Sequence, residues 1–163
     1  MHVIVTGMVQ VGKSTAIDKF LKSAGLEADG FRTFWEYGDY RILRMKSLAD
    51  GSSTVIATEE TGRLRPVPEA FDAFGKELVE RSGTRDITVL DELGRLELRS
   101  PEFCSAVLKR MKDPRPVIAV VKPEHNEFLD AVRAVENTAV IWVDVENRDS
   151  VPEKICEFLG MKI

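Results

Sequence analysis

The residues from Gly7 to Ser14 have the types and spacing that bind a chain of phosphates. Their sequence, GMVQVGKS, fully matches the pattern G-x-x-x-x-G-K-[ST]. The glycines at the fixed positions let backbone N–H groups approach phosphate oxygens without an intervening Cβ. Lys13 offers an ammonium group to the β- and γ-phosphates, and the Ser14 hydroxyl is a ligand for Mg²⁺. The predicted nucleotide-binding residues are Gly7, Met8, Val9, Gln10, Val11, Gly12, Lys13, Ser14 and Thr15.

A second candidate group is the pair of adjacent carboxylates, Asp91 and Glu92. They follow the apolar run 87–90, which is typical of a buried strand, and ligands of open α/β sheets bind at the carboxyl ends of strands. We expect Asp91 to hold Mg²⁺ through its hydration shell, and Glu92 to orient or deprotonate an attacking water. Alone, such a pair indicates a solvated loop, but together with the phosphate loop it favours a catalytic pair.

The acid that directly follows the metal-binding Asp favours water activation, and therefore hydrolysis. Small GTPases instead position water from a separate segment and recognise guanine with an Asn-Lys-x-Asp motif. The nearest segment here is 121–124, with the sequence VKPE, which lacks both the Asn and the Asp. The sequence therefore disfavours a standard GTPase.

The surrounding pattern predicts the elements that position these residues. Strands are expected over 3–5, 87–90, 117–121 and 140–143. Helices are expected from the phosphate loop to Gly25, after Pro68, from Ser100-Pro101, over 124–136, and from a capping box that starts at Ser150. Apolar strands that alternate with helices predict an α/β fold, a three-layer sandwich with a mainly parallel central sheet.

The segment 30–68 differs in texture and predicts a small β-rich insertion. Short β-like pieces at 31–35, 40–45 and 54–57 are separated by turn signals. Its arginines have two interpretations. They form solvated strand faces, or one of them reaches the γ-phosphate in cis as an arginine finger does. These residues are Arg32, Arg41, Arg44, Arg63 and Arg65.

Composition limits the remaining classes. A chain of 163 residues, 44% hydrophobic and 31% charged, suits a single domain over 1–163. No apolar run approaches the roughly 18 residues of a membrane span and the first ten residues lack a signal-peptide pattern, so a cytoplasmic protein without membrane contact is expected. Cys104 and Cys156 indicate free, partly buried thiols in a reducing compartment.

Charge and histidine content disfavour two further functions. The net charge of −4 offers no overall basic field, so the sequence gives no evidence for a nucleic-acid partner, although it leaves a local basic patch open. His2 and His125 lie far apart, and no Cys/His cluster accompanies either, which disfavours a zinc site. We expect a monomer.

The run from Asp91 to Leu98, DELGRLEL, resembles the D-E-[IL]-G-[KR]-[ML]-E-L signature of a family of small P-loop nucleoside triphosphatases, which includes the cancer-related and thermophile enzymes. Three further segments resemble that family in the same order along the chain. They are GFRT at 30–33, VVKP at 120–123 and NRD at 147–149. The resemblance thus spans nearly the whole chain.

The resemblance implies a P-loop NTPase fold and Mg²⁺-dependent hydrolysis of nucleoside 5′-triphosphates, including ATP and GTP, to diphosphates and phosphate. Arg95 becomes a candidate phosphate or transition-state contact, although a surface arginine paired with a neighbouring Glu is the alternative. Asn147 and Arg148 become candidates for the base pocket, or are turn residues ahead of Ser150. Gln10 stands where the family usually has glycine, so either its φ is negative or the loop is strained.

Two other functions share this scaffold. A nucleoside or nucleotide kinase would use Glu92 for an acceptor hydroxyl and would need an acceptor pocket, for which the segment 30–68 and Arg115 supply the arginine-bearing candidates. A non-catalytic nucleotide-binding module would not need Glu92. Hydrolysis is the leading hypothesis.

Overall fold

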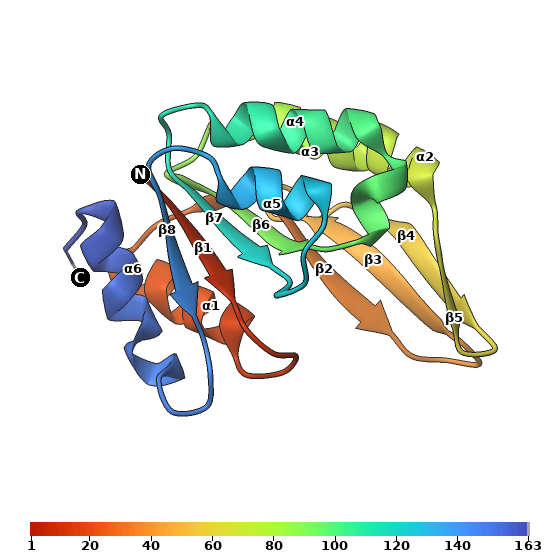
Figure 1. Cartoon of the computed structure of the whole chain (residues 1–163), viewed down its shortest axis with the longest axis horizontal. Coiled ribbons are helices and arrows are strands. Elements are labelled where there is room, and N and C mark those ends of the chain that lie inside the picture. Colours follow the sequence, from red (N-terminus) through yellow and green to blue (C-terminus); the bar gives the residue numbers. More distant parts are fainter. Residues whose placement is uncertain (163) are drawn as a thin grey trace.

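The computed structural model describes residues 1–162, and within this range the strands form one eight-stranded sheet (Figure 1). The strands are β1 (His2–Thr6), β2 (Ala28–Glu36), β3 (Arg41–Ser47), β4 (Ser53–Glu60), β5 (Arg63–Pro66), β6 (Ile87–Leu93), β7 (Val117–Val121) and β8 (Thr138–Trp142). Their order is β5-β4-β3-β2-β6-β7-β1-β8. From β2 to β8 all neighbours are parallel, whereas β3, β4 and β5 continue the sheet in antiparallel fashion.

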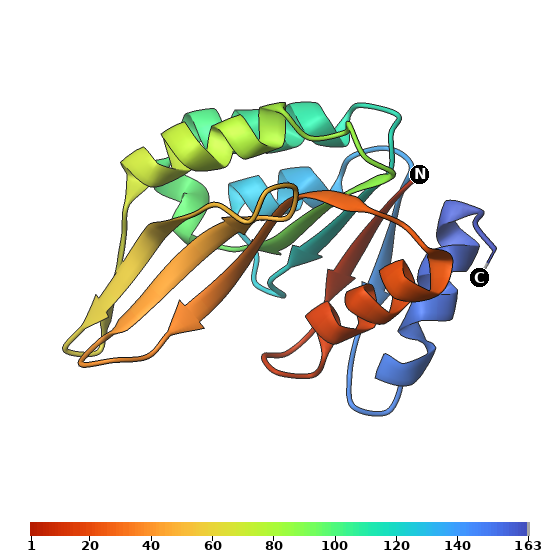
Figure 2. The same cartoon turned by 180° about the vertical axis from the view of Figure 1, so that it is seen from behind.

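Helices cover both faces of this sheet. They are α1 (Lys13–Ala24), α2 (Pro68–Ala70), α3 (Lys76–Glu80), α4 (Pro101–Met111), α5 (Glu127–Arg133) and α6 (Val151–Leu159). Side chains of α3, α4 and α5 share one core cluster, and those of α1 and α6 share another. Figure 1 shows these two groups on opposite sides of the sheet, and Figure 2 shows the same layers from behind. The predicted three-layer α/β sandwich is confirmed.

Strand β1 shows how the sequence produces two cores. Its side chains alternate between the faces, so Ile4 packs in the cluster under α3–α5, while Val3 and Val5 pack in the cluster under α1 and α6. All three are fully buried, as expected for a strand in the interior of a parallel sheet.

The β-rich segment continues the central sheet and does not form a separate layer. We call its four strands, β2 to β5, the wing. Its inner strand β2 pairs in parallel with β6, so it belongs to the parallel part as well. The pairing of β3 with β4 shifts register at Leu43/Arg44, where the β4 residue Ile56 has no direct partner. Strand β5 was not predicted, and in Figure 1 the wing extends away from α1 and α6.

One predicted helix start and two predicted side-chain caps need correction. The helix predicted over 124–136 is α5, which is shorter because the Asn126 side chain accepts a hydrogen bond from the Leu129 N–H at 2.8 Å and caps it there. The last helix, α6, does begin directly after Ser150, but the capping box was wrong, since the Ser150 hydroxyl donates to the Asn147 carbonyl at 2.9 Å and completes a 3-10 turn, Arg148–Ser150. Ser100 does precede α4, but its hydroxyl donates to the Pro68 carbonyl.

The pattern after Pro68 forms a helix in three pieces, because a π-helical stretch, Phe71–Gly75, separates α2 from α3. Cys104 and Cys156 are free thiols, half-buried and buried, as predicted. Among the helices of residues 1–162, none has the length and hydropathy of a membrane span.

Candidate active site

The phosphate loop lies between β1 and α1, where its pattern requires. Gly7 has φ +147°, and a Cβ placed there would lie 2.2 Å from the Val143 carbonyl oxygen, so the loop passes where only glycine fits. Gly12, with φ +101°, precedes the first residue of α1. The helix therefore directs its unpaired N–H groups into the loop, which is the arrangement that binds phosphate.

Gln10 has φ +60°, in the left-handed region. This excludes the negative φ that the sequence had left open, so the loop carries the strain of a non-glycine residue there, about 1–2 kcal/mol. Gln10 and its neighbours Met8 and Val9 are exposed, which means the tip of the loop projects into solvent.

Lys13 is buried at the start of α1, with its ammonium directed into the loop. Its Nζ donates hydrogen bonds to the carbonyl oxygens of Gly7 at 2.9 Å and Met8 at 2.6 Å. Burial lowers the pKa of Lys13, although the nearby Glu92 and Asp91 oppose that shift. The ammonium thus lies among the loop groups that the sequence predicted to surround a phosphate.

Asp91 is the most buried acid of the site and has two polar partners. The Ser14 hydroxyl donates to Asp91 Oδ2 at 2.7 Å, and Arg32 Nε donates to the same oxygen at 3.0 Å. Burial raises the pKa of Asp91, while Ser14 and Arg32 act against the rise. Arg32 also pairs with Asp18 of α1, so it links that helix to the acidic strand end.

The Ser14 hydroxyl and the Asp91 carboxylate suit Mg²⁺ that is also bound by substrate and water, and they are too few for a metal that only the protein holds. Mg²⁺ usually takes one or two carboxylates together with substrate phosphates and waters. Ser14 and Asp91 supply a hydroxyl and a carboxylate beside the phosphate loop. Within residues 1–162, no group of three or more His, Cys, Asp or Glu side chains has the arrangement of a protein-only metal site.

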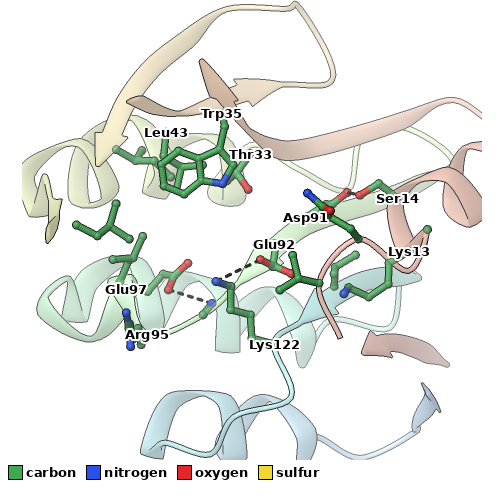
Figure 3. Close-up of a pocket in the computed structure, with 18 of the residues that line it drawn as sticks. Lys13, Ser14, Thr33, Trp35, Leu43, Asp91, Glu92, Arg95, Glu97 and Lys122 are labelled. Carbon is green, nitrogen blue, oxygen red and sulfur yellow. Dashed lines mark hydrogen bonds and ion pairs between the residues drawn. The ribbon is translucent and has the colours of Figure 1, made fainter. Parts of the chain in front are cut away.

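Glu92 lies next along β6 and faces a different part of the site. Its carboxylate is 3.8 Å from the Lys122 ammonium, and Figure 3 shows it between Lys122 and Lys13. Burial raises the pKa of Glu92, and the two lysines oppose the rise. A carboxylate in this position can accept a proton from a group attacking a phosphate bound in the loop.

A cavity of about 470 Å³ joins these groups. We call its part beside the loop and the two acids the phosphate half. The predicted site residues that line the cavity are Val9, Gln10, Gly12, Lys13, Ser14, Thr15, Asp91, Glu92 and Arg95. Gly7 and Met8 contribute the carbonyls that hold Lys13, and Val11 packs against the core under α1.

Arg95 is exposed at the edge of this cavity, and the salt bridges of residues 1–162 do not include it. This exposure agrees with the alternative of a surface arginine, but the predicted pairing with a neighbouring Glu is not found within those residues. Its predicted contact with phosphate stays a prediction.

Asn147 and Arg148 do not line the cavity. The Asn147 side chain accepts from the Asp144 N–H at 3.0 Å and donates to the Trp142 carbonyl at 2.8 Å, so it organises the turn after β8. Arg148 Cδ lies 3.5 Å from the point where a Cβ of Gly12 would be, which places Arg148 against the phosphate loop. A role of these two residues in base binding stays a prediction.

Sequence reasoning missed part of the site. Lys122 and Glu97 line the cavity, and Arg32 was only one of five arginines considered. The structure distinguishes Arg32 because it is the cross-strand partner of Asp91, whereas Arg41 and Arg44 pair with carboxylates of the wing itself. Only the parallel pairing of β2 with β6 identifies Arg32 as a site residue, and no local sequence pattern reveals that pairing.

The fold and the site together define a P-loop nucleotide hydrolase. A family model described as NTPase matches residues 2–156. The nucleoside-triphosphatase THEP1 of Methanosarcina acetivorans is 30% identical over an alignment of 166 positions, which covers 95% of this chain and 94% of that protein. THEP1 of Thermotoga maritima is 26% identical, over 98% and 95% of the two chains.

Two solved structures are also similar. The crystal structure of THEP1 from Aquifex aeolicus has a TM-score of 0.81 and 25% identity, covering 98% of this chain and 99% of that one. The solution structure of a human cancer-related nucleoside triphosphatase has a TM-score of 0.77 and 26% identity, covering 97% and 96%. The chain belongs to this NTPase family, which confirms the predicted family and its hydrolase activity on nucleoside triphosphates.

Proposed function

We propose that this chain hydrolyses nucleoside 5′-triphosphates to diphosphates and phosphate at one Mg²⁺-dependent site, built from the phosphate loop, Asp91 and Glu92. The observation that carries the proposal is that Lys13, the Ser14–Asp91 pair and Glu92 all line the same cavity. ATP and GTP are the substrates to test first.

In this mechanism the loop N–H groups and Lys13 bind the β- and γ-phosphates. Lys13 Nζ exchanges the carbonyls of Gly7 and Met8 for phosphate oxygens, and it remains within the loop. Ser14 and Asp91 hold the metal. Mg²⁺, when bound, neutralises charge that develops on the phosphate oxygens.

Glu92 orients the attacking water and accepts its proton. Lys122, whose ammonium lies 3.8 Å from Glu92, keeps positive charge on the same side of the cavity. Arg95 stands at the cavity edge, and we propose that it contacts the transferring phosphoryl group. Asn147 and Arg148 are proposed to flank the base.

The test measures phosphate release from ATP and GTP, with and without Mg²⁺, for the wild type and Glu92→Gln. We expect release to require Mg²⁺ and to fall about 10²- to 10⁴-fold in the variant, while nucleotide affinity is kept. Glu157→Gln, an exposed position on α6, is the matched control.

Two outcomes would contradict the proposal. Full activity in Glu92→Gln would remove Glu92 from the mechanism. Nucleotide binding without turnover in the wild type would favour the non-catalytic module.

We further propose that residues 1–163 act as one domain and as a cytoplasmic monomer without a nucleic-acid partner. The free thiols of Cys104 and Cys156 support a reducing compartment. Gel filtration with light scattering tests the oligomeric state directly.

A further inference from the structure

The cavity extends well beyond the phosphate half. Its other part, which we call the wing half, is lined by apolar side chains from the wing and from the turn after β6 (Figure 3). These are Trp35, Leu43, Ile56, Leu64 and Leu96. Each wing strand contributes one of them, and the register shift opposite Ile56 is the kind of bulge that redirects a side chain toward a site.

Hydrolysis alone gives no reason for this apolar surface, because a water molecule needs only polar partners. A cavity of about 470 Å³ lies within the range of roughly 300–1,000 Å³ that is typical of small-molecule sites, and those sites combine apolar walls with a few polar groups. Thr33, Arg95 and Glu97 supply the polar groups here. Figure 3 shows Trp35 and Leu43 across the cavity from Arg95 and Glu97.

The wing half lies on the side from which a nucleophile must approach. Phosphoryl transfer places the entering and leaving oxygens roughly in line through the γ-phosphorus. The leaving oxygen points back to the phosphate loop, so the entering oxygen comes past Glu92, where the wing half begins. The base of the triphosphate is proposed to lie elsewhere, beside Arg148, and the turn after β8 that carries Arg148 lies at the opposite end of the sheet from the wing.

From this geometry we infer that the wing half binds a nucleoside, whose hydroxyl group accepts the γ-phosphoryl group of the nucleoside triphosphate. The inference rests on the proposed phosphate site and adds a second substrate to it. The acceptor oxygen forms a bond to the γ-phosphorus, and the bond from that phosphorus to the β–γ bridging oxygen breaks. The acceptor proton passes to Glu92, and the nucleoside diphosphate leaves with the bonding electrons.

The side chains that line the wing half favour a nucleoside as the acceptor. A planar heterocycle matches the half-buried Trp35 ring and the aliphatic side chains beside it. Arg95 can donate hydrogen bonds to hydroxyl or carbonyl oxygens of the nucleoside. Burial raises the pKa of Glu97 to about 7, so near neutral pH its carboxyl can donate as well as accept hydrogen bonds to the heterocycle.

Binding can be measured without catalysis. The chain has two tryptophans, Trp35 and Trp142, so Trp142→Phe leaves the cavity tryptophan as the single reporter. Its fluorescence is titrated with adenosine, guanosine, cytidine and thymidine while ADP and Mg²⁺ occupy the phosphate half. We expect a saturable change with at least one nucleoside at saturating ADP.

Transfer is measured with ATP labelled at the γ-phosphate and the same four nucleosides. Labelled nucleoside monophosphate and labelled phosphate are separated by chromatography. Leu64→Phe, which fills the wing half from the edge strand, is expected to lower the ratio of transfer to hydrolysis about tenfold. Phe34→Leu is the matched control, since Phe34 neighbours Trp35 on β2 but does not line the cavity.

The outcomes separate this inference from the proposed function. Phosphate release with no labelled monophosphate and no fluorescence change overturns the acceptor site and leaves hydrolysis intact. Displacement of the nucleoside by ADP also overturns it, because the wing half would then hold the base of the triphosphate. Loss of both phosphate release and transfer overturns the proposed function itself.

Discussion

The two halves of the cavity are built in different ways. The phosphate half comes mainly from one continuous loop and one strand end, with Lys13, Ser14, Asp91 and Glu92 as its chemical groups. The wing half takes one or two side chains from each of four successive strands, and further side chains from a turn. A contiguous sequence motif determines which residues form most of the phosphate half, whereas strand register determines which residues form the wing half.

The difference also appears in how each half is held. In the phosphate half, polar groups bind one another through charged hydrogen bonds, such as that between Ser14 and Asp91 at 2.7 Å. In the wing half, apolar side chains pack, and Arg41 lies 4.7 Å from the centre of the Trp35 ring. Substitutions in the first half should therefore act on chemistry, and those in the second on fit and stability.

The largest effect on nucleotide binding is expected for Lys13→Met. Removing the ammonium deletes a charged hydrogen-bond donor to the β- and γ-phosphates, so ATP affinity should fall about 100-fold. Isothermal titration calorimetry with ADP and a non-hydrolysable ATP analogue measures it. Lys22→Met, exposed on the same helix, is the control. Unchanged affinity in Lys13→Met would refute the phosphate-loop assignment.

Arg32→Met tests the residue that links the two halves, since Arg32 belongs to the wing but holds Asp91. Loss of this partner should weaken the apparent affinity for Mg²⁺ about tenfold, because groups that orient a metal ligand typically contribute that much. The measurement is phosphate release as a function of Mg²⁺ concentration. Arg44→Met, which removes an ion pair within the wing, should leave the curve in place. Coincident curves for Arg32→Met and the wild type would contradict the prediction.

The smallest effect on hydrolysis, but a measurable one on stability, is expected for Glu97→Gln. Burial raises the pKa of folded Glu97 from 4.5 to about 7, so between these pH values the unfolded chain loses this proton more readily than the folded chain. The contribution of Glu97 to stability therefore falls as pH rises through that window. The stability of Glu97→Gln relative to the wild type should therefore increase by about 3 kcal/mol between pH 4.5 and pH values above 7.

Urea unfolding at pH 5 and pH 8 checks this last prediction. Gln can still accept the hydrogen bond that the Gly94 N–H donates to Glu97 at 3.0 Å. The exposed Glu157→Gln serves as the control for a change of charge alone. An equal stability difference at both pH values would show that Glu97 ionises normally in the folded chain.

The same contrast explains what the sequence alone could predict. Residues adjacent in the chain, such as Asp91 and Glu92, carry their chemistry in a local pattern, and alternation of apolar strands with helices indicated the α/β sandwich. The contact of Arg32 with Asp91 depends on the pairing of β2 with β6, and the two residues are 59 positions apart in the sequence. The sequence places Lys122 only at the end of a strand, because nothing local indicates that it reaches Glu92.

Local patterns also failed where tertiary contacts compete with them. The hydroxyls of Ser100 and Ser150 have the residue type of a helix cap, but both donate to carbonyl groups elsewhere. The π-helical stretch between α2 and α3 leaves no signature in the spacing of Phe71, Phe74 and Leu78. The wing half was missed entirely, since its residues share no spacing in the chain.

The position of β2 has a consequence for motion. This strand is hydrogen-bonded to β6 on one side and to β3 on the other, so Asp91 and the wing are joined by one continuous ladder of strand hydrogen bonds. Hinge bending between the two halves would break that ladder, whereas the exposed tip of the phosphate loop at 8–10 can rearrange without doing so. The sheet therefore fixes the distance between the two halves, and with it the combined length of two molecules bound across the cavity. The loop tip can change only how closely the phosphate half is covered.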